Sequence, residues 1–364
     1  MFNGPGIQTN LHVFSVRCPE IERMLTFRDW LRHNSDDREM YASTKQSLAQ
    51  QEWQSVDEYA SAKTAVVSEI MTRADVRLDA ALVKQLLREQ HADLSELPLG
   101  ERGGGWDNAV FRAGDQLAVR LPCRATSAVL MSHEQRWLMQ LSQELPLAIP
   151  APLRIGRPSA RFPWPWSVVP WLPGDSALVA PMLDGDAVAL ALGTFLHALH
   201  RPAPADAPFN PWRGVDLAER TDLLHRDVAA VGDAIDGVAV LSLWRRLVTT
   251  PAWRGPRLWI HGDLHPGNLL VENRRLSAVV DFGDLTAGDP ATDLSVAWML
   301  PSLQRSIFRS AARSTWSPVD DDSWSRARGW ALALGVAYLA ASRADEPLAM
   351  LARTTIDAAL REDV

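Results

Sequence analysis

The chain has 364 residues, of which 47% are hydrophobic, and a formal net charge of −7 at pH 7. This length predicts two or three domains, each with a packed core. The negative balance and the lack of a basic block argue against a nucleic-acid partner. Cys18 and Cys123 are far apart, which favours a reducing compartment, and no N-terminal signal pattern is seen, so a cytoplasmic protein is expected. The longest apolar helical stretch, near residues 330–341, is too short to span a bilayer, and no membrane association is expected.

The first 75 residues predict a strand at residues 10–14 and helices at 25–34, 38–51 and 57–74. The segments TNLHVF, FRDWLRHN, YASTKQSLA and YASAKTAVVSEI resemble the C-terminal part of GrpB-like nucleotidyltransferases. The catalytic portion of such a domain is absent, so nucleotidyl transfer is not expected. The apolar helix faces are expected to pack on the rest of the chain or on a second copy, which would form a homodimer.

The next segment predicts strands around a glycine triplet, Gly103-Gly104-Gly105. Glycine lets backbone N–H groups approach phosphates closely, although such a triplet is also typical of a flexible turn. A strand is expected at residues 116–121 and a helix at 127–145. The apolar run 168–172 follows.

The C-terminal half predicts mainly helices. The stretch 186–200 has helical spacing and ends before a proline-rich loop. Its histidines, His197 and His200, are expected to pack or cap rather than bind metal. Asp289 precedes a proline and predicts a helix start, and Asp289 and Asp293 are expected to support a neighbouring loop. The acidic run 320–322 is expected to be solvated surface; contact with a cationic ligand is the alternative.

The stretch 259–284 reads WIHGDLHPGNLLVENRRLSAVVDFGD and carries the chemistry. Two apolar runs, 269–271 and 276–280, flank a polar turn and predict a hairpin. Asp263 and Asn268 lie on the loop entering the hairpin, and Asp281 follows its exit. Because a hairpin returns its exit close to its entrance, these three side chains are expected to converge.

A carboxylate, an amide and a second carboxylate suit phosphoryl transfer. That reaction needs a group to orient the attacking hydroxyl and oxygen ligands for Mg²⁺ on the nucleotide phosphates. Asp263 suits the base, and Asn268 and Asp281 suit the metal. A surface hairpin with incidental turn residues is the alternative.

HGDLHPGN, VVDFGD and GDPATDLSVAW together resemble the aminoglycoside phosphotransferase family of protein-kinase-like small-molecule kinases, from about residue 79 to the C-terminus. The resemblance implies an α+β, bilobal protein-kinase-like fold with an antiparallel-sheet N-lobe and a mainly helical C-lobe. Residues 1–75 would then be a short α-rich N-terminal extension, 76–172 the N-lobe and 173–364 the C-lobe. It also implies that helices after Asp293 form the substrate wall.

The same resemblance implies further nucleotide-binding residues. The glycine loop and Arg120 would hold the phosphates, Glu134 would hold Arg120, and residues 168–172 would form the hinge that binds the purine. Arg120 replaces the lysine that is commoner at this position; it keeps the charge but is bulkier. The expected cofactor-binding residues are Gly104, Gly105, Asn108, Arg120, Glu134, Val169 and Trp171.

The sequence therefore predicts an ATP- or GTP- and Mg²⁺-dependent O-phosphotransferase acting on a hydroxyl of a small molecule. An antibiotic, either an aminoglycoside or a macrolide, is the favoured acceptor. A metabolic kinase for a choline-like or amino-alcohol substrate is the second choice. A non-catalytic nucleotide-binding scaffold is the alternative from another class, and the arginine at position 120 is its only support.

Overall fold

The computed structural model describes residues 2–4, 7–9, 19–33, 35–51, 59, 62–74, 78–104, 107–180, 185–313, 320–343 and 346–361. The chain divides into two compact units. The first comprises residues 1–113, 119–129 and 156–166, and the second comprises residues 114–118, 130–155 and 167–364.

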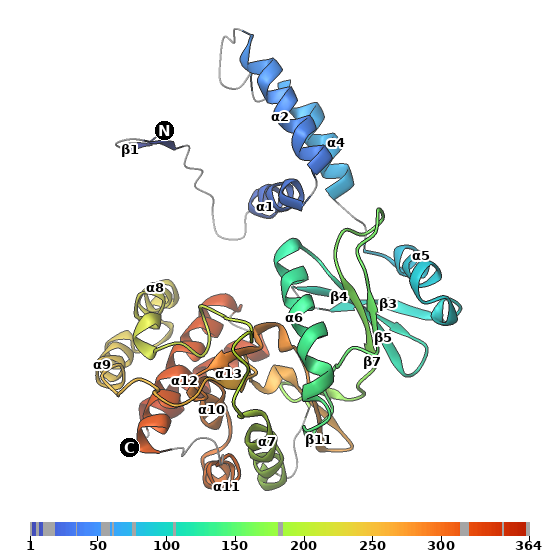
Figure 1. Cartoon of the computed structure of the whole chain (residues 1–364). Helices are drawn as coiled ribbons and strands as arrows, with labels where there is room; N and C mark the ends of the chain where they lie inside the picture. Colours follow the sequence, from blue (N-terminus) through green and yellow to red (C-terminus); the bar gives the residue numbers. More distant parts are fainter. Residues whose placement is uncertain are drawn as a thin grey trace. The chain divides into compact units, whose positions relative to one another are not determined.

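The N-terminal segment begins with a short antiparallel hairpin of β1 (Phe2–Gly4) and β2 (Ile7–Thr9). Helices α1 (Pro19–His33), α2 (Ser35–Ala49) and α4 (Thr64–Ala74) follow and pack on one another (Figure 1). These helices match the three that the sequence predicts. The strand predicted at residues 10–14 lies outside the described residues.

The largest sheet has the strand order β3-β4-β5-β7-β6, and β3 and β4 pair antiparallel. Helix α5 precedes it and begins at Asp79, whose side chain accepts a hydrogen bond from Leu82 N at 2.9 Å. Helix α6 follows β5 in sequence, as expected. The elements are α5 (Ala80–Gln90), β3 (Leu99–Gly104), β4 (Asn108–Ala113), β5 (Leu117–Pro122), α6 (Ala125–Leu141), β6 (Arg154–Gly156) and β7 (Trp166–Pro170).

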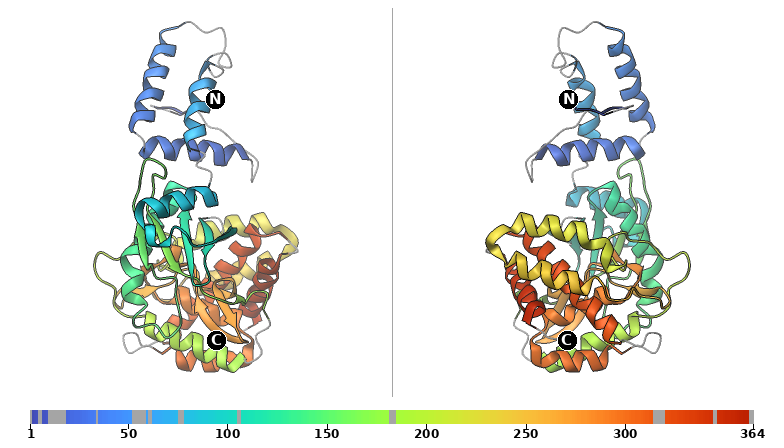
Figure 2. Two further views of the ribbon diagram at one scale, coloured as in Figure 1. Left: turned by 90° about the vertical axis from the view of Figure 1, so that its right-hand side faces the viewer. Right: turned by 90° about the vertical axis from the view of Figure 1, so that its left-hand side faces the viewer.

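The second unit is mainly helical, as predicted, and α12 is its central helix. Helices α8, α9, α10 and α13 all contact α12, so residues on every face of α12 are buried, including Trp330. In Figure 2, α8 and α9 lie side by side. The helices are α7 (Gly185–Leu199), α8 (Thr221–Val231), α9 (Gly237–Leu247), α10 (Ala291–Leu294), α11 (Arg305–Ala311), α12 (Asp321–Ala341) and α13 (Pro347–Arg361).

Helix α12 begins at Asp320, whose carboxylate accepts hydrogen bonds from the backbone N of Ser323 at 2.8 Å and from its hydroxyl at 2.7 Å. This cap satisfies an N–H group that the first turn of a helix leaves without a partner. Asp320 therefore has a structural use within the acidic run that the sequence assigned to solvated surface.

Two small sheets position the catalytic segment. Strand β9 (Leu258–Ile260) pairs antiparallel with β12 (Thr286–Gly288). Strands β10 (Leu269–Glu272) and β11 (Arg275–Val279) form the predicted hairpin, and β8 (Asp175–Ser176) pairs with the other edge of β10. The turn residues Asn273 and Arg274 both have positive φ, of 49° and 67°, which suits the tight primed turn that joins two twisted strands.

Candidate active site

The catalytic loop starts at the end of the buried strand β9. Asp293 on α10 holds this loop through hydrogen bonds to its backbone. The Asp293 carboxylate accepts hydrogen bonds from the backbone N of His261 at 2.8 Å and of Gly262 at 2.9 Å. His200 Nε2 lies 3.1 Å from the same carboxylate. Asp293 is fully buried, so these contacts compensate its charge. The predictions that Asp293 supports the loop and that His200 packs there are confirmed.

Gly262 is required by this loop. Its φ is +88°, and a Cβ added there would lie 2.4 Å from the carbonyl oxygen of Asp284. Any side chain would force the backbone of residue 284 away from the loop. Hence the catalytic loop and the segment after the hairpin are in direct backbone contact.

Asp263 has two carboxylate oxygens in different environments. Its Oδ1 accepts hydrogen bonds from Tyr338 Oη at 2.7 Å and from Arg213 Nη2 at 3.2 Å. Its Oδ2 has His265 Nε2 at 3.7 Å, which is beyond hydrogen-bond distance. About a quarter of the side chain is exposed, at 26%. Asp263 therefore keeps one oxygen available for a ligand while the other fixes its orientation.

The charge state of Asp263 is set by opposing effects. Burial raises its pKa, but the positive charge of Arg213, the electrostatic effect of His265 and the hydrogen bond from Tyr338 outweigh it and hold the pKa below its ordinary value. Burial also raises the pKa of Tyr338 well above its ordinary value, and the neighbouring Asp263 carboxylate raises it further. The pair is therefore a carboxylate and a neutral phenol at neutral pH.

Arg213 links Asp263 to a second carboxylate. Its Nη2 lies 3.1 Å from Asp284 Oδ2, and Asn210 Nδ2 donates to Asp284 Oδ1 at 2.7 Å. Burial raises the pKa of Asp284 despite the positive charge of Arg213, and the negative Asp263 adds to the increase. One guanidinium therefore holds two carboxylates together.

Asn268 lies at the entrance of the hairpin, as predicted. Its Nδ2 donates to the carbonyl oxygen of Asp263 at 2.8 Å, and its own carbonyl accepts a hydrogen bond from Val280 N at 2.9 Å. The first bond joins the side chain of Asn268 to the backbone of the catalytic loop. The second joins the backbone of Asn268 to Val280, the residue before Asp281. Because the NH₂ group is engaged, the side-chain Oδ1 remains as an oxygen donor for a cation.

Asp281 follows the hairpin in a left-handed backbone conformation, with a φ of 64°. Non-glycine residues rarely adopt this conformation, and where it persists it is common at functional sites. The side chain is exposed, and within the described residues its carboxylate has no hydrogen bond or ion pair. Two oxygen donors, from Asn268 and Asp281, fit Mg²⁺, which keeps several waters and takes few protein ligands.

No group of three or more His, Cys, Asp or Glu side chains forms a metal site in the part of the chain that the structure describes. His197 is not near such a group either; its Nδ1 contacts the backbone oxygen of Arg313. The donor set at Asn268 and Asp281 is therefore suited to a hard cation shared with a phosphate ligand rather than to zinc.

Gly103 and Gly104 form the end of β3, and β4 begins at Asn108, so the glycine triplet falls where the sequence predicts the junction of two strands. Gly104 pairs with Ala109 across the β3–β4 hairpin, has a φ of +103°, and could not carry a Cβ, which would lie 2.2 Å from Asn108 O. Asp107 anchors the loop, because its carboxylate accepts hydrogen bonds from Arg124 Nη2 and Ser127 Oγ, both at 2.7 Å. Asn108 Oδ1 is buried and has no hydrogen-bond partner among the described residues. Gly105 lies outside the described residues.

The remaining predicted nucleotide residues lie on the expected elements. Arg120 on β5 is 7% exposed and Glu134 on α6 is 1% exposed, and both make polar interactions. The ion pair between them stays a prediction. Val169 on β7 is buried, whereas Trp171 is partly exposed and donates its backbone N–H to Gln116 O at 2.7 Å.

Sequence reasoning missed Arg213 and Tyr338 and gave no role to Asp284 and His265. Asp284 and His265 stand inside the predicted catalytic stretch, so their position was a usable signal. Arg213 and Tyr338 are 50 and 75 residues from Asp263 in sequence. Neither belongs to a motif, so only the tertiary structure brings them to the site.

Comparison with known proteins agrees with this arrangement. Residues 99–330 match the model of the phosphotransferase enzyme family, and residues 1–73 match that of the GrpB protein family. The chain belongs to the phosphotransferase enzyme family. Its relatives there include an aminoglycoside 3′-phosphotransferase of Escherichia coli, 26% identical over 155 residues, which are 40% of this chain and 57% of that protein.

The N-terminal segment of this family member has relatives of its own. The UPF0157 protein BH1888 of Halalkalibacterium halodurans is 56% identical over 75 residues, which are 21% of this chain and 38% of that protein. The chain thus spans less than two thirds of the length of either relative.

Solved structures support the predicted kinase-like fold of this phosphotransferase family member. The GDP and kanamycin complex of APH(2″)-IIIa superposes with a TM-score of 0.55 at 19% identity, covering 76% of this chain and 97% of that one. Macrolide 2′-phosphotransferase type I superposes with a TM-score of 0.50 at 21% identity, covering 76% and 96%. None of the helices in the described ranges is long and apolar enough to cross a membrane.

A pocket of about 520 Å³ lies beside the catalytic carboxylate. We call it the arginine pocket, and it is lined by Arg213, Arg220, Leu223, Arg226, Asp284 and Ala337, among others. Arg213 binds Asp263 directly, and Ala337 precedes Tyr338, the other partner of Asp263. The arginine pocket is therefore lined by a direct partner of the catalytic side chain.

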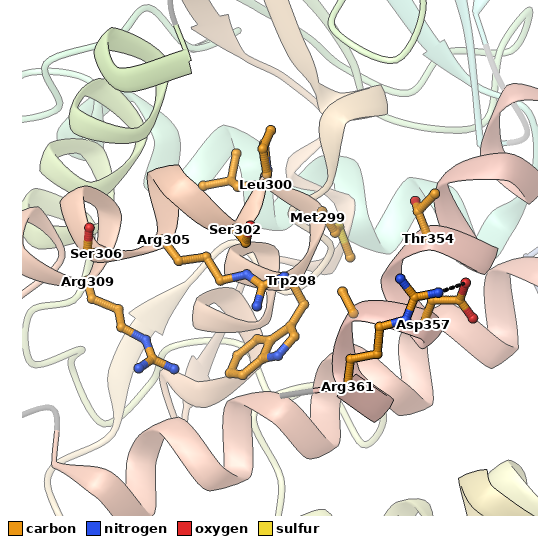
Figure 3. Close-up of a pocket in the computed structure, with 12 residues that line it drawn as sticks. Trp298, Met299, Leu300, Ser302, Arg305, Ser306, Arg309, Thr354, Asp357 and Arg361 are labelled. Atoms are coloured by element: carbon orange, nitrogen blue, oxygen red, sulfur yellow. Dashed lines mark hydrogen bonds and ion pairs between the residues drawn. The ribbon is translucent and has the colours of Figure 1, made fainter. Parts of the chain in front are cut away.

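A larger cavity of about 880 Å³ lies elsewhere in the second unit, lined by residues of η6 (Ser295–Met299), α11 and α13 (Figure 3). Trp298, Arg305 and Arg361 line it, and Arg361 pairs with Asp357 at 3.4 Å. It contains no residue of the catalytic loop or the hairpin. Size alone therefore does not mark the active site.

Proposed function

We propose that the chain is a nucleotide- and Mg²⁺-dependent O-phosphotransferase that transfers the terminal phosphoryl group of ATP or GTP to a hydroxyl of a small molecule. One observation carries this proposal. Asp263 Oδ1 is engaged by Tyr338 and Arg213, which leaves Oδ2 for the acceptor hydroxyl. Phosphoryl transfer depends on positioning and electrostatics more than on covalent chemistry, so a fixed carboxylate suits it.

Asp263 orients the acceptor and takes its proton. Its low pKa keeps it ionised at neutral pH, so it accepts the hydrogen bond from the hydroxyl in the ground state. A carboxylate of low basicity removes the proton late, as the new oxygen–phosphorus bond forms, which agrees with the loose transition state of this reaction. Arg213 stabilises the carboxylate without occupying Oδ2.

Asn268 and Asp281 would hold Mg²⁺, which when bound neutralises charge on the donor phosphates. The proposed phosphate-binding groups are the glycine loop with Gly104, Gly105 and Asn108, and Arg120, with Glu134 as its support. Val169 and Trp171 are the proposed purine-binding residues. The choice between ATP and GTP is left to experiment.

The substrates named for the relatives indicate which class of acceptor this enzyme phosphorylates. Aminoglycoside phosphotransferases appear among the sequence relatives and the solved structures, and a macrolide phosphotransferase appears among the solved structures, which supports an antibiotic acceptor. A choline-type or amino-alcohol kinase is the second candidate. The proposal also includes a cytoplasmic location and a homodimer through residues 1–75.

The experiment is a transfer assay with γ-labelled ATP and GTP, each with Mg²⁺ or with excess chelator. The acceptor panel contains aminoglycosides, macrolides and metabolic alcohols. The expected result is Mg²⁺-dependent labelling of one acceptor class and slow Mg²⁺-dependent nucleotide hydrolysis without an acceptor. Nucleotide binding without any Mg²⁺-dependent turnover would support the scaffold alternative and overturn the proposal.

A further inference from the structure

Arg220 is a buried arginine without an ion-pair partner. It ends the turn η2 (Leu217–Arg220), just before α8, and is 6% exposed. Its guanidinium lies over the ring of Trp330 at 5.6 Å. Within the described residues no carboxylate lies within ion-pair distance of Arg220, and its buried Nε has no hydrogen-bond partner.

This arrangement is costly for the folded protein. Buried charges are normally paired, because transfer out of water removes their hydration. Burial and the positive charges of Arg213 and Arg226 together lower the pKa of Arg220 to about 10, and the carboxylates Asp227 and Asp284 compensate this effect only in part. The side chain is still charged at neutral pH. A charge kept at such a cost indicates a use that the free protein does not satisfy.

Arg220 lines the arginine pocket, where each of the other two arginines has a carboxylate partner. Arg213 is held by Asp263 and Asp284, and Arg226 Nη2 lies 2.9 Å from Asp227 Oδ1. The opposite wall is apolar, formed by α12 at Ala337, Ala340 and Ala341. Among the described residues, Arg220 is therefore the pocket arginine without a carboxylate at ion-pair distance, and there is space beside it for a small molecule.

We infer that the acceptor carries an anionic group, a carboxylate or a phosphate, which Arg220 binds while the acceptor hydroxyl meets Asp263. This inference rests on the proposed phosphoryl transfer and replaces its cationic acceptor classes with an anionic one. Both anions match the fork of a guanidinium, which can donate two parallel hydrogen bonds. Arg213 lines the pocket together with Arg220 and donates to Asp263 Oδ1 at 3.2 Å, so the pocket lies next to the residue that holds the catalytic carboxylate.

The same charge disfavours a polycationic acceptor. An ammonium group placed against Arg220 would meet the positive charges of Arg220 and Arg226, and the described residues give Arg220 no carboxylate at ion-pair distance. Like charges that are brought together out of water repel strongly. The pocket thus selects against the cationic acceptors that the names of the relatives suggest.

The test uses acceptors that differ only in one charged group. Hydroxyl compounds are assayed in matched sets: a carboxylate and its amide, a phosphate monoester and the parent alcohol, and the corresponding amine, with kanamycin as a polycation. The wild-type protein is compared with Arg220→Met, Arg220→Lys and the exposed α9 control Arg245→Met. Each kcat/KM is expressed relative to the Mg²⁺-dependent nucleotide hydrolysis of the same variant.

The wild type is expected to prefer the anionic member of a set, and comparison of the carboxylate and phosphate sets identifies the anion. Arg220→Met is expected to lose about 10- to 100-fold in kcat/KM for anionic acceptors, mainly through KM, because a charged hydrogen bond is lost. Arg220→Lys should restore part of this loss, and Arg245→Met should not differ from wild type. Equal use of anionic and cationic acceptors, unchanged by Arg220→Met, would overturn the inference while leaving the proposed function intact.

Two further measurements separate the remaining outcomes. A purely structural role predicts that Arg220→Met melts at a lower temperature, whereas a ligand-binding role predicts an equal or higher melting temperature, because an unpaired buried charge is removed. Titration with inorganic phosphate, with Mg²⁺ and ADP filling the nucleotide site, tests anion binding without turnover. Phosphate binding that needs Arg220, with no transfer to any acceptor, would retain the anion site and reject the proposed function. A lower melting temperature with unchanged selectivity would reject the site.

Discussion

Two buried arginines near α12 have opposite environments. Arg326 is 3% exposed and donates to Asp289 Oδ2 at 2.7 Å, to Pro251 O at 2.9 Å and to Ser323 Oγ at 3.3 Å. Arg220 is 6% exposed, and among the described residues its guanidinium contacts the face of Trp330. Both arginines are buried, so burial alone does not explain the difference in their hydrogen bonds.

This difference in hydrogen bonding distinguishes a charged side chain that stabilises the fold from one that is available to bind a ligand. Arg326 and Asp293 each make several hydrogen bonds within the fold. In contrast, Asp263 Oδ2, the exposed Asp281 carboxylate and the Arg220 guanidinium have no hydrogen bond among the described residues. The protein therefore combines a rigid support with a face that a ligand must complete.

The largest effect is expected at Asp263, whose backbone belongs to the rigid support and whose side chain faces the ligand. Asp263→Asn should lower turnover by about 10²- to 10⁴-fold, because the proton acceptor is lost. Nucleotide affinity should remain, since Asn268 and Asp281 are untouched. Single-turnover kinetics and nucleotide titration measure the two quantities. The exposed carboxylate control Asp206→Asn should keep normal turnover, and normal turnover in Asp263→Asn would remove Asp263 from this role.

The second effect tests the two arginines directly. Arg326→Met should lower the free energy of unfolding by about 3–5 kcal/mol, because it leaves the buried Asp289 carboxylate without its partner. Arg220→Met should cause no such loss. Denaturant titration of both variants measures the difference. Similar losses in the two variants would contradict the distinction between a structural and a ligand-binding arginine.

The third prediction tests whether Asp281 is one of the residues that bind a ligand. Asp281→Ala should weaken Mg²⁺-dependent nucleotide binding by about 10- to 100-fold and affect binding in chelator much less. Because alanine tolerates a positive φ less well than aspartate, stability should at the same time be unchanged or slightly lowered. Titrations with and without Mg²⁺ measure this, with Glu272→Ala on the same hairpin as the control. An unchanged metal dependence would reject the ligand assignment.

The smallest effect on chemistry is expected from deletion of residues 1–75. Every residue assigned to phosphoryl transfer lies after residue 100, so turnover per folded molecule should be retained. Solubility or stability should fall, because apolar residues such as Val66 and Ile70 lie in a segment too short to fold well alone. Turnover, melting temperature and a sizing column test this. A well-folded but inactive truncation would show that the segment completes the site.

The sequence was informative where the chemistry is local. The hairpin, its Asn273-Arg274 turn and the approach of Asn268 to the loop follow from residues that are neighbours in sequence, and the structure confirms them. The fold class followed from the same stretch, because its motif is specific. Asp293 was also placed correctly as a support, since the preceding Asp-Pro pair indicated a helix start at the loop.

The arginine pocket was not foreseeable in the same way. Arg213, Arg220 and Tyr338 come from three separate elements, and an isolated arginine in a sequence is usually a solvated charge. That Arg220 is buried and unpaired depends on how η2 packs against Trp330, which no local pattern encodes. The family resemblance therefore predicts an acceptor from the substrates of relatives. The arginine pocket predicts an acceptor from the residues of this chain.

The close approach at Gly262 has a consequence for how this protein can diversify. Because no side chain fits between Gly262 and the carbonyl of Asp284, the catalytic loop and this wall of the pocket can shift only as one piece. New acceptor preferences are therefore most accessible at positions that project from α8 and its preceding turn, such as Arg220, Leu223 and Arg226. Laboratory evolution toward other acceptors should accumulate changes there and leave residues 261–263 and 281–284 untouched.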